Sequence, residues 1–191
     1  MKKRLLLLTL LAALLLTFAA CAGRKFEPDK ISELYSGARQ VNARVKITTN
    51  TGVLQTYVLD YFRNGAESVS EILEPESLRG IRAVITDGSP RLVFEDAAAE
   101  TLLPSVSGFT PMDAMDGLLR DLAGSAPADY ALEKSGGEDI AALNYPQHFT
   151  EYAAEKRVWL SAADLAPRAC EFYLDGMMTM RLEIESIQIY K

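Results

Sequence analysis

The residues that could perform acid–base, nucleophilic or metal chemistry are few and scattered along the chain. His148 is the single histidine and lies in an expected loop, where a histidine is usually a surface residue. The carboxylates gather in two clusters, at Glu71, Glu74 and Glu76 and at Asp113 and Asp116. The first cluster alternates along an expected strand, and the second lies in the first turns of an expected helix, where the helix dipole favours negative charge. No His-Glu-x-x-His, Gly-x-Ser-x-Gly or Ser-x-x-Lys motif occurs. We therefore expect no enzyme, with no catalytic residue, no metal site and no bound cofactor.

Cys21 is the residue whose chemistry the sequence indicates most clearly. Three cations in residues 2–4 precede an uncharged run rich in Leu and Ala, Leu5–Ala20, which is the pattern of an export signal. The run is shorter than the about 20 apolar residues that a membrane span needs. The small pair before Cys21 resembles the lipobox of bacterial lipoproteins, although Phe18 stands where that family usually has an aliphatic residue. The resemblance implies cleavage before Cys21 and a covalent diacylglyceryl lipid on its sulfur. The alternative is an ordinary secretory signal cut near Ala20.

The expected organisation follows from this reading. Residues 1–20 are expected to be a lipoprotein signal peptide, residues 21–28 a lipidated tether, and residues 29–191 a single domain. Two acyl chains anchor a protein durably, so we expect an exported protein held on the extracytoplasmic face of a bacterial membrane. Residues 1–20 hold three of the 20 Lys and Arg and none of the 26 Asp and Glu, which leaves a net charge of −9. This acidic balance argues against a nucleic-acid partner.

The first half of the mature chain predicts one helix followed by a β-meander. Pro28 precedes apolar residues at helical spacing through residue 38, and a period of two then begins. Strands are expected at residues 41–48, 53–63, 67–73, 81–86 and 91–95. Tight turns such as Asn64-Gly65 join them, and such short connections require antiparallel pairing.

The second half predicts a helix and a further set of strands. Thr110 and Pro111 announce a helix that ends near Gly124. Strands are expected at residues 130–134, 140–145, 157–160, 168–174 and 177–190. The apolar alternation of the last strand slips by one position at Glu185-Ser186, which indicates a β-bulge. Cys170 lies in the alternating strand 168–174 and is expected to be a small buried apolar residue without a disulfide partner.

These patterns favour a mainly β fold with α (α+β), in which a curled antiparallel sheet, or incomplete β-barrel, is covered by the N-terminal helix and by the mid-chain helix as a lid. Strand 53–63 is apolar on both faces, so it needs cover on both or lines a cavity. The candidate residues of an apolar cavity and its lid are Met112, Met115, Leu118, Leu119, Leu122, Val58, Phe62 and Trp159. The alternative is that these side chains simply fill a core.

The order of elements resembles the LolA/LolB lipoprotein-carrier family. The resemblance is carried by "MDGLLRDLAG" at residues 115–124 and by Val158–Leu160, Asp164–Arg168 and Tyr173–Gly176. It implies an incomplete barrel with a hydrophobic cavity for acyl chains of lipids or lipoproteins, and thus a membrane-anchored carrier or receptor. It also suggests Leu102, Leu103 and Val106 as exposed apolar loop residues for delivery. Lipoproteins resembling the germination protein GerS share this fold, which leaves open a second function: a non-catalytic adaptor that binds a cell-wall or spore-cortex hydrolase.

Overall fold

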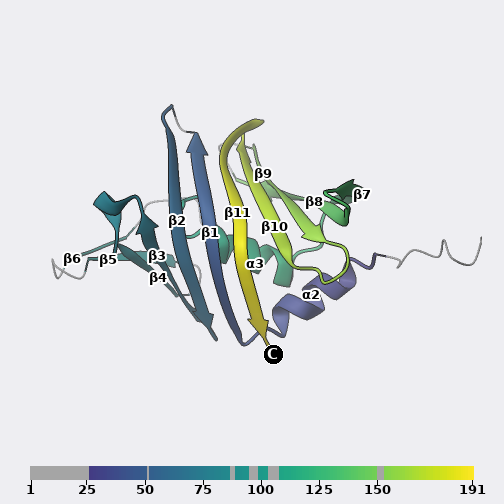
Figure 1. The fold of residues 1–191 in the computed structure, drawn as a ribbon, viewed down its shortest axis with the longest axis horizontal. Helices are drawn as coiled ribbons and strands as arrows, with labels where there is room; N and C mark the ends of the chain where they lie inside the picture. The colour runs from purple at the N-terminus through teal and green to yellow at the C-terminus, as the bar shows by residue number, and fades with distance from the viewer. Residues whose placement is uncertain (1–25, 51, 87–88, 95–98, 103–107, 150–152) are drawn as a thin grey trace, which may run out of the picture.

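The computed structural model describes residues 26–50, 52–86, 89–94, 99–102, 108–149 and 153–191, which form two α-helices and eleven strands (Figure 1). Cys21 and the expected signal peptide lie outside the described residues, as do Leu103 and Val106. The lipidation of Cys21 therefore stays a prediction.

The elements follow the expected order closely. The helices are α2 (Asp29–Ser36) and α3 (Ala114–Gly124), and a single 3-10 turn spans Glu76–Leu78. The strands of the first half are β1 (Gln40–Asn50), β2 (Leu54–Asn64), β3 (Glu67–Glu74), β4 (Arg82–Thr86), β5 (Ser89–Phe94) and β6 (Ala99–Leu102). Those of the second half are β7 (Asp129–Ser135), β8 (Glu138–His148), β9 (Ala153–Ser161), β10 (Pro167–Leu174) and β11 (Met177–Tyr190).

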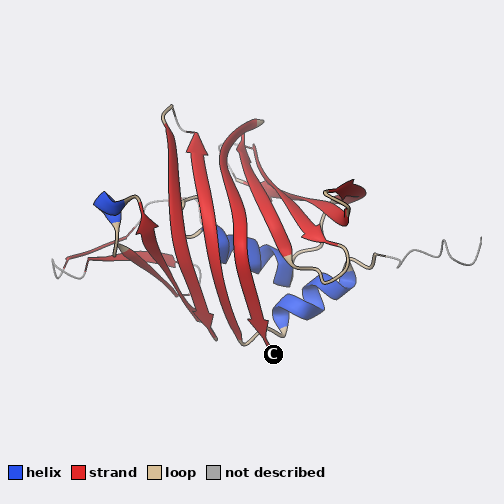
Figure 2. Cartoon of the chain, in the orientation of Figure 1, coloured by secondary structure: helices blue, strands red, loops and turns tan. Residues whose placement is uncertain are grey.

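All eleven strands form one antiparallel sheet in the order β6-β5-β4-β3-β2-β1-β11-β10-β9-β8-β7. Two meanders, one from each half of the chain, are therefore joined along a single seam between β1 and β11. The sheet is curled but not closed (Figure 2), and β6 and β7 form its two edges. The predicted fold class is confirmed.

The predicted β-bulge in the last strand is also confirmed. Arg44 of β1 pairs with Ser186, whereas its neighbour Val45 pairs with Ile184, so Glu185 is the extra residue. A second irregularity occurs near the start of β11, where Phe172 pairs with Met180 but Tyr173 pairs with Met178. The two bulges bend β11 and increase its twist, which helps the wide sheet to curl.

The inner face of the curled sheet is the face that α3 covers. Val41, Val45 and Ile47 of β1 point to this face and are at most 1% exposed. The helix α2 packs against the end of α3, where Ser32 Oγ donates a hydrogen bond of 2.6 Å to the carbonyl oxygen of Ala123. Each large apolar side chain buried here contributes about 1.5–3 kcal/mol of transfer free energy.

Three details differ from the sequence prediction, and the first is that His148, expected in a loop, is the last residue of β8 and pairs with Ala153. The helix α3 begins at Ala114, and Pro111 lies in a turn before it. The cause is Asp113, whose carboxylate accepts hydrogen bonds from the chain that precedes it and so holds residues 108–113 in a compact turn. The edge strand β6 was not expected, because its four residues show no clear alternation.

Candidate functional site

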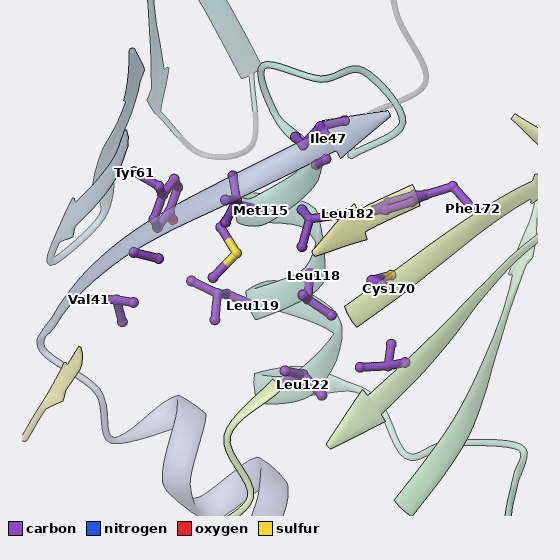
Figure 3. Close-up of a cluster of buried hydrophobic side chains, with 14 of the residues drawn as sticks. Val41, Ile47, Tyr61, Met115, Leu118, Leu119, Leu122, Cys170, Phe172 and Leu182 are labelled. Atoms are coloured by element: carbon purple, nitrogen blue, oxygen red, sulfur yellow. The ribbon is translucent and has the colours of Figure 1, made fainter. Parts of the chain in front are cut away.

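The candidate site is the space between α3 and the inner face of the sheet, together with the surfaces that the fold leaves exposed. The five apolar residues expected on the lid are all on α3 or the turn before it, and all are buried. Figure 3 shows the four on α3 pointing into the molecule. Leu118, Leu119 and Leu122 are 0% exposed, Met115 is 2% exposed and Met112 is 7% exposed. They belong to one continuous apolar cluster with inner-face residues that include Val41, Ile47, Tyr61, Cys170, Phe172 and Leu182. The side chains of this helix thus fill a core.

The structure does not bring the other three candidate residues to this space. Val58, Phe62 and Trp159 pair across the sheet with Lys46, Asn42 and Ala169, respectively, and these pairs lie on the outer face. The inner face of β2 carries Leu59 and Tyr61 instead. Of the eight residues grouped from the sequence, the five on α3 and its preceding turn therefore cover the inner face, whereas the three strand residues lie on the outer face, because successive side chains of a strand alternate between its faces. This grouping is corrected accordingly.

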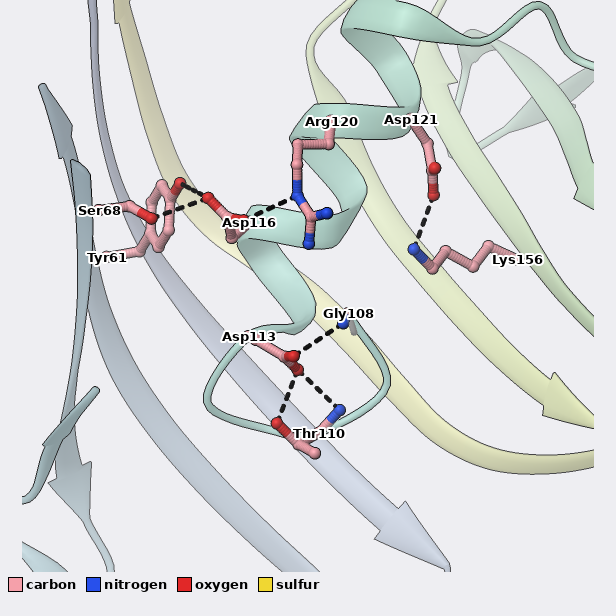
Figure 4. A network of polar contacts seen from close by, with 9 residues as sticks. All are labelled: Tyr61, Ser68, Gly108, Thr110, Asp113, Asp116, Arg120, Asp121 and Lys156. Carbon is pink, nitrogen blue, oxygen red and sulfur yellow. Dashed lines mark hydrogen bonds and ion pairs between the residues drawn. The ribbon is translucent and has the colours of Figure 1, made fainter. Parts of the chain in front are cut away.

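A polar network attaches the start of α3 to β2 and β3 (Figure 4). The carboxylate of Asp116 accepts hydrogen bonds from Ser68 Oγ at 2.7 Å and from the Tyr61 hydroxyl at 3.2 Å. It also receives Arg120 Nε at 2.9 Å from the next turn of the helix. Asp116 and Ser68 are buried. Burial first, and then the charge of Asp116, raises the pKa of the Tyr61 hydroxyl well above its ordinary range.

A buried ion pair attaches the other end of α3 to β9. Lys156 Nζ lies 2.7 Å from Asp121 Oδ2, and the two side chains are 3% and 14% exposed. The ammonium group also lies 5.2 Å from the ring centroid of Phe109 and 5.8 Å from that of Phe172. Cation–π attraction adds to the ion pair when such a group is desolvated.

The turn before α3 is held as closely as the helix itself. The Asp113 carboxylate accepts hydrogen bonds from the backbone N–H of Gly108 at 2.7 Å and of Thr110 at 2.8 Å. Thr110 Oγ1 donates a third bond of 2.6 Å. A Cβ placed on Gly117 would lie 2.6 Å from the Cα of Gly108, so the helix and the turn touch backbone to backbone.

Sequence reasoning assigned no role to Lys156 or Asp121 and took Asp113 and Asp116 as helix-dipole residues. One signal could have found the ion pair. Along β9, Ala154, Lys156, Val158 and Leu160 share one face and three of the four are apolar. A lysine in that series predicts a buried charge, which needs an acidic partner from another element.

Hollows lined by described residues lie on the outer face of the sheet. One is bordered by Arg44, Asp60 and Phe62, and another by Trp159, Glu133 and Arg168. Both contain polar contacts between their lining residues. In the first, Arg44 Nε lies 2.7 Å from Asp60 Oδ1, and in the second, Trp159 Nε1 donates a hydrogen bond of 3.0 Å to Glu133 Oε1. This face is a solvated surface with mixed charge.

The most apolar exposed surface lies at one end of the sheet, on two hairpin tips. Val53 directly precedes β2 and is 75% exposed, and Leu54 is the first residue of β2 and is 72% exposed. Met177 and Met178 begin β11 and are 70% and 38% exposed. Thr49 of β1 pairs with Met180 and Asn50 pairs with Leu54, so β1 separates the two tips. We call these four residues the tip patch.

Within the described part of the chain, no three or more His, Cys, Asp or Glu side chains are grouped so that they could hold a metal ion. Among the same residues, no helix combines the length and the apolar character needed to cross a membrane.

Comparisons with known proteins establish the fold. No protein-family model matches the sequence, and the search of curated proteins finds no match. Among solved structures, a DUF1329 family protein from Desulfovibrio piger has a TM-score of 0.53 at 12% identity, covering 85% of this chain and 90% of that one. An uncharacterized conserved protein from Thermus thermophilus has a TM-score of 0.52 at 14% identity and 85% coverage of both chains. A LolA superfamily protein from Nitrosomonas europaea has a TM-score of 0.41 at 15% identity, with 86% and 94% coverage. At these identities the likeness concerns the fold alone, and it rests on the first two structures, whose TM-scores exceed 0.5.

Proposed function

We propose that this chain is a lipid-anchored, non-catalytic adaptor on the extracytoplasmic face of a bacterial membrane, which binds a protein partner through its exposed surface. The observation that carries this proposal is the attachment of α3. A lid that admits an acyl chain must leave the inner face, whereas α3 is attached there at both ends.

A buried ion pair must separate before α3 can leave the inner face. Moving α3 away from β9 would part Lys156 from Asp121, whose side chains are 3% and 14% exposed. The same movement would remove the Asp116 carboxylate from the hydroxyls of Tyr61 and Ser68 and expose three leucines that are 0% exposed. A helix held in this way supports the adaptor role better than that of a mobile lid.

The tip patch is the surface best suited to a partner. Residues 47–59 include no charged side chain, in a protein in which 24% of residues are charged. Exposed apolar side chains that cluster at one end of a soluble domain mark interaction surfaces. By the resemblance to GerS-like lipoproteins, the partner class is a cell-wall hydrolase.

The membrane anchor is tested by Cys21→Ala. We expect this substitution to move the protein from the membrane fraction to the soluble fraction, and incorporation of labelled palmitate to cease. A chain that stays in the membrane fraction after the substitution would exclude the lipid anchor. Cys170→Ala serves as the control, because Cys170 is buried and should carry no lipid.

The partner is tested by photocrosslinking in cells. A photoreactive amino acid at Leu54 or Met177 should give one discrete adduct with an extracytoplasmic protein, identified by mass spectrometry. The same group at Lys46, which is exposed on the outer face, should not give it.

The carrier function predicts a different result. Native mass spectrometry of the Cys21→Ala protein from the periplasmic or extracellular fraction should then reveal a bound lipid or lipoprotein acyl chain. If the chain is an adaptor, the spectrum should show the mass of the protein alone. A stoichiometrically bound acyl chain would instead identify the chain as a carrier.

A further inference from the structure

The strand β7 forms one edge of the sheet and is unusually open. All seven of its residues are exposed, and within the described part of the chain it pairs only with β8. An edge strand presents a row of unpaired backbone N–H and C=O groups that can accept another strand. Described side chains contact two of its residues: the ring centroid of Phe26 lies 5.2 Å from that of Tyr130, and Trp159 Nε1 donates a hydrogen bond to Glu133.

The side chains of β7 are sorted by face. Tyr130 and Leu132 pair with the inner-face residues Leu143 and Ala141, and they are 48% and 55% exposed. Lys134 follows them on the same face. The opposite face carries both acids, Asp129 and Glu133.

This arrangement is complementary to itself. When two copies of β7 run antiparallel about a two-fold axis at Leu132, each residue meets a partner that suits it. Leu132 faces Leu132 of the second copy, and Tyr130 faces Lys134, an arrangement that permits cation–π contact. Glu133 faces Ala131, and Asp129 faces Ser135. No like charges are directly opposed, and directly opposed pairs determine most of the stability of a strand pair.

Other two-fold registers that keep the inner faces on one side are poorer. An axis at Ala131 places Asp129 opposite Glu133 twice, and an axis at Glu133 places that carboxylate opposite its own copy. Only the axis at Leu132 pairs all seven residues. A two-fold interface requires this kind of self-complementary pattern.

We propose that β7 is a homodimerisation edge, at which a second copy of this chain continues the sheet across a two-fold axis at Leu132. The proposal concerns the assembly of the chain with itself and is independent of the adaptor function.

The register is tested by disulfide trapping in the full chain, on a Cys21→Ala background in which the buried Cys170 is the remaining cysteine. Directly opposed residues of antiparallel strands have Cα atoms about 4.5–5.5 Å apart, which suits a disulfide. Leu132→Cys should therefore form a covalent dimer on mild oxidation. Tyr130→Cys and Lys134→Cys should each form no covalent dimer alone, but should cross-link to each other when the two variants are mixed. Leu54→Cys, at a leucine outside β7 that is more exposed than Leu132, should not cross-link.

Affinity is tested by sedimentation equilibrium of the same background protein. Leu132→Lys places two ammonium groups at the axis and should raise the dimer dissociation constant by about 100-fold. Leu54→Lys should leave it unchanged, and circular dichroism should show both variants folded. A monomeric parent protein, a dimer that Leu132→Lys leaves intact, or cross-linking of Tyr130→Cys alone would each overturn the proposal.

Discussion

Lys156 Nζ lies 2.7 Å from Asp121 Oδ2 in a site where neither side chain is more than 14% exposed, and this pair joins the central helix to β9. Gln147 Nε2 donates a further hydrogen bond to Asp121 at 3.2 Å. The pair fixes where α3 lies on the sheet, although a pair of charges is expensive to bury.

Replacing one member of this pair should therefore be costly. Lys156→Met leaves a buried carboxylate without its cation, and we expect the free energy of unfolding to fall by about 3–5 kcal/mol. Urea titration measures the change. Adding Asp121→Asn should recover part of the loss, because the remaining charge is removed. Lys30→Met, which removes an exposed ion pair with Glu27, should cost less than about 1 kcal/mol, and an equal loss at both sites would contradict the argument.

The close contact of α3 with the preceding turn should tolerate no methyl group. Gly117→Ala would place a Cβ 2.6 Å from the Cα of Gly108, and overpacking of this kind costs about 1–3 kcal/mol. Gly124→Ala is the matched control, since a Cβ there meets nothing within 4 Å. The control should be neutral or stabilise by up to about 1 kcal/mol through helix propensity. Thermal denaturation distinguishes the two variants. A similar melting temperature for both would show that the turn at Gly108 moves to make room for the methyl group.

Two buried tyrosines should respond in opposite directions to loss of the hydroxyl group. The Tyr35 hydroxyl donates a hydrogen bond of 2.8 Å to the carbonyl oxygen of Leu165, so Tyr35→Phe should destabilise by about 1 kcal/mol. The Tyr145 hydroxyl is buried and has no hydrogen-bond partner among the described residues. Tyr145→Phe removes this unsatisfied group and should stabilise by about 1 kcal/mol. Urea titrations of both variants check the signs.

Stability should fall in alkaline solution. Burial raises the pKa of Tyr35, Tyr61 and Tyr145 from the ordinary value of 10.0, and that of Cys170 from 9.0. Below pH 9 these groups are protonated in both the folded and unfolded states, so stability is unaffected there. Above pH 10 the unfolded chain loses these protons while the folded chain keeps them. Each group then lowers the free energy of unfolding by about 1.4 kcal/mol per pH unit.

Urea titrations at pH 8, 10 and 11 measure this dependence. Tyr145→Phe removes one of these groups, so the free energy of unfolding of this variant should fall less steeply with pH than that of the parent protein. A free energy of unfolding that is constant from pH 8 to pH 11 would mean that these groups ionise equally in both states.

Local sequence patterns were sufficient for most of the sheet. The alternation in β1 and the Asn64-Gly65 turn place β1 and β2 within two residues of their observed bounds, and the slip at Glu185 predicts the observed bulge. These features depend on neighbours in the chain, which is why a single sequence reveals them.

Features that depend on distant residues were not predictable in this way. The two apolar faces of β2 look alike in sequence, and only the position of α3 decides that Tyr61 points inward and Phe62 outward. The same holds for Lys156, whose partner lies 35 residues away in another element. The second bulge lies between Met178 and Met180 of β11. It leaves no slip in the apolar pattern of the sequence, because the residues on both sides of it are apolar.

The last strand of the chain lies in the middle of the sheet, where β11 pairs with β1 across residues as distant as Gln40 and Tyr190. During synthesis, therefore, the two meanders cannot be joined until β11 has left the ribosome. Pairing across so great a sequence separation is slow to form. Until then β1 lacks one of its two neighbouring strands, and one edge of each meander is left unpaired.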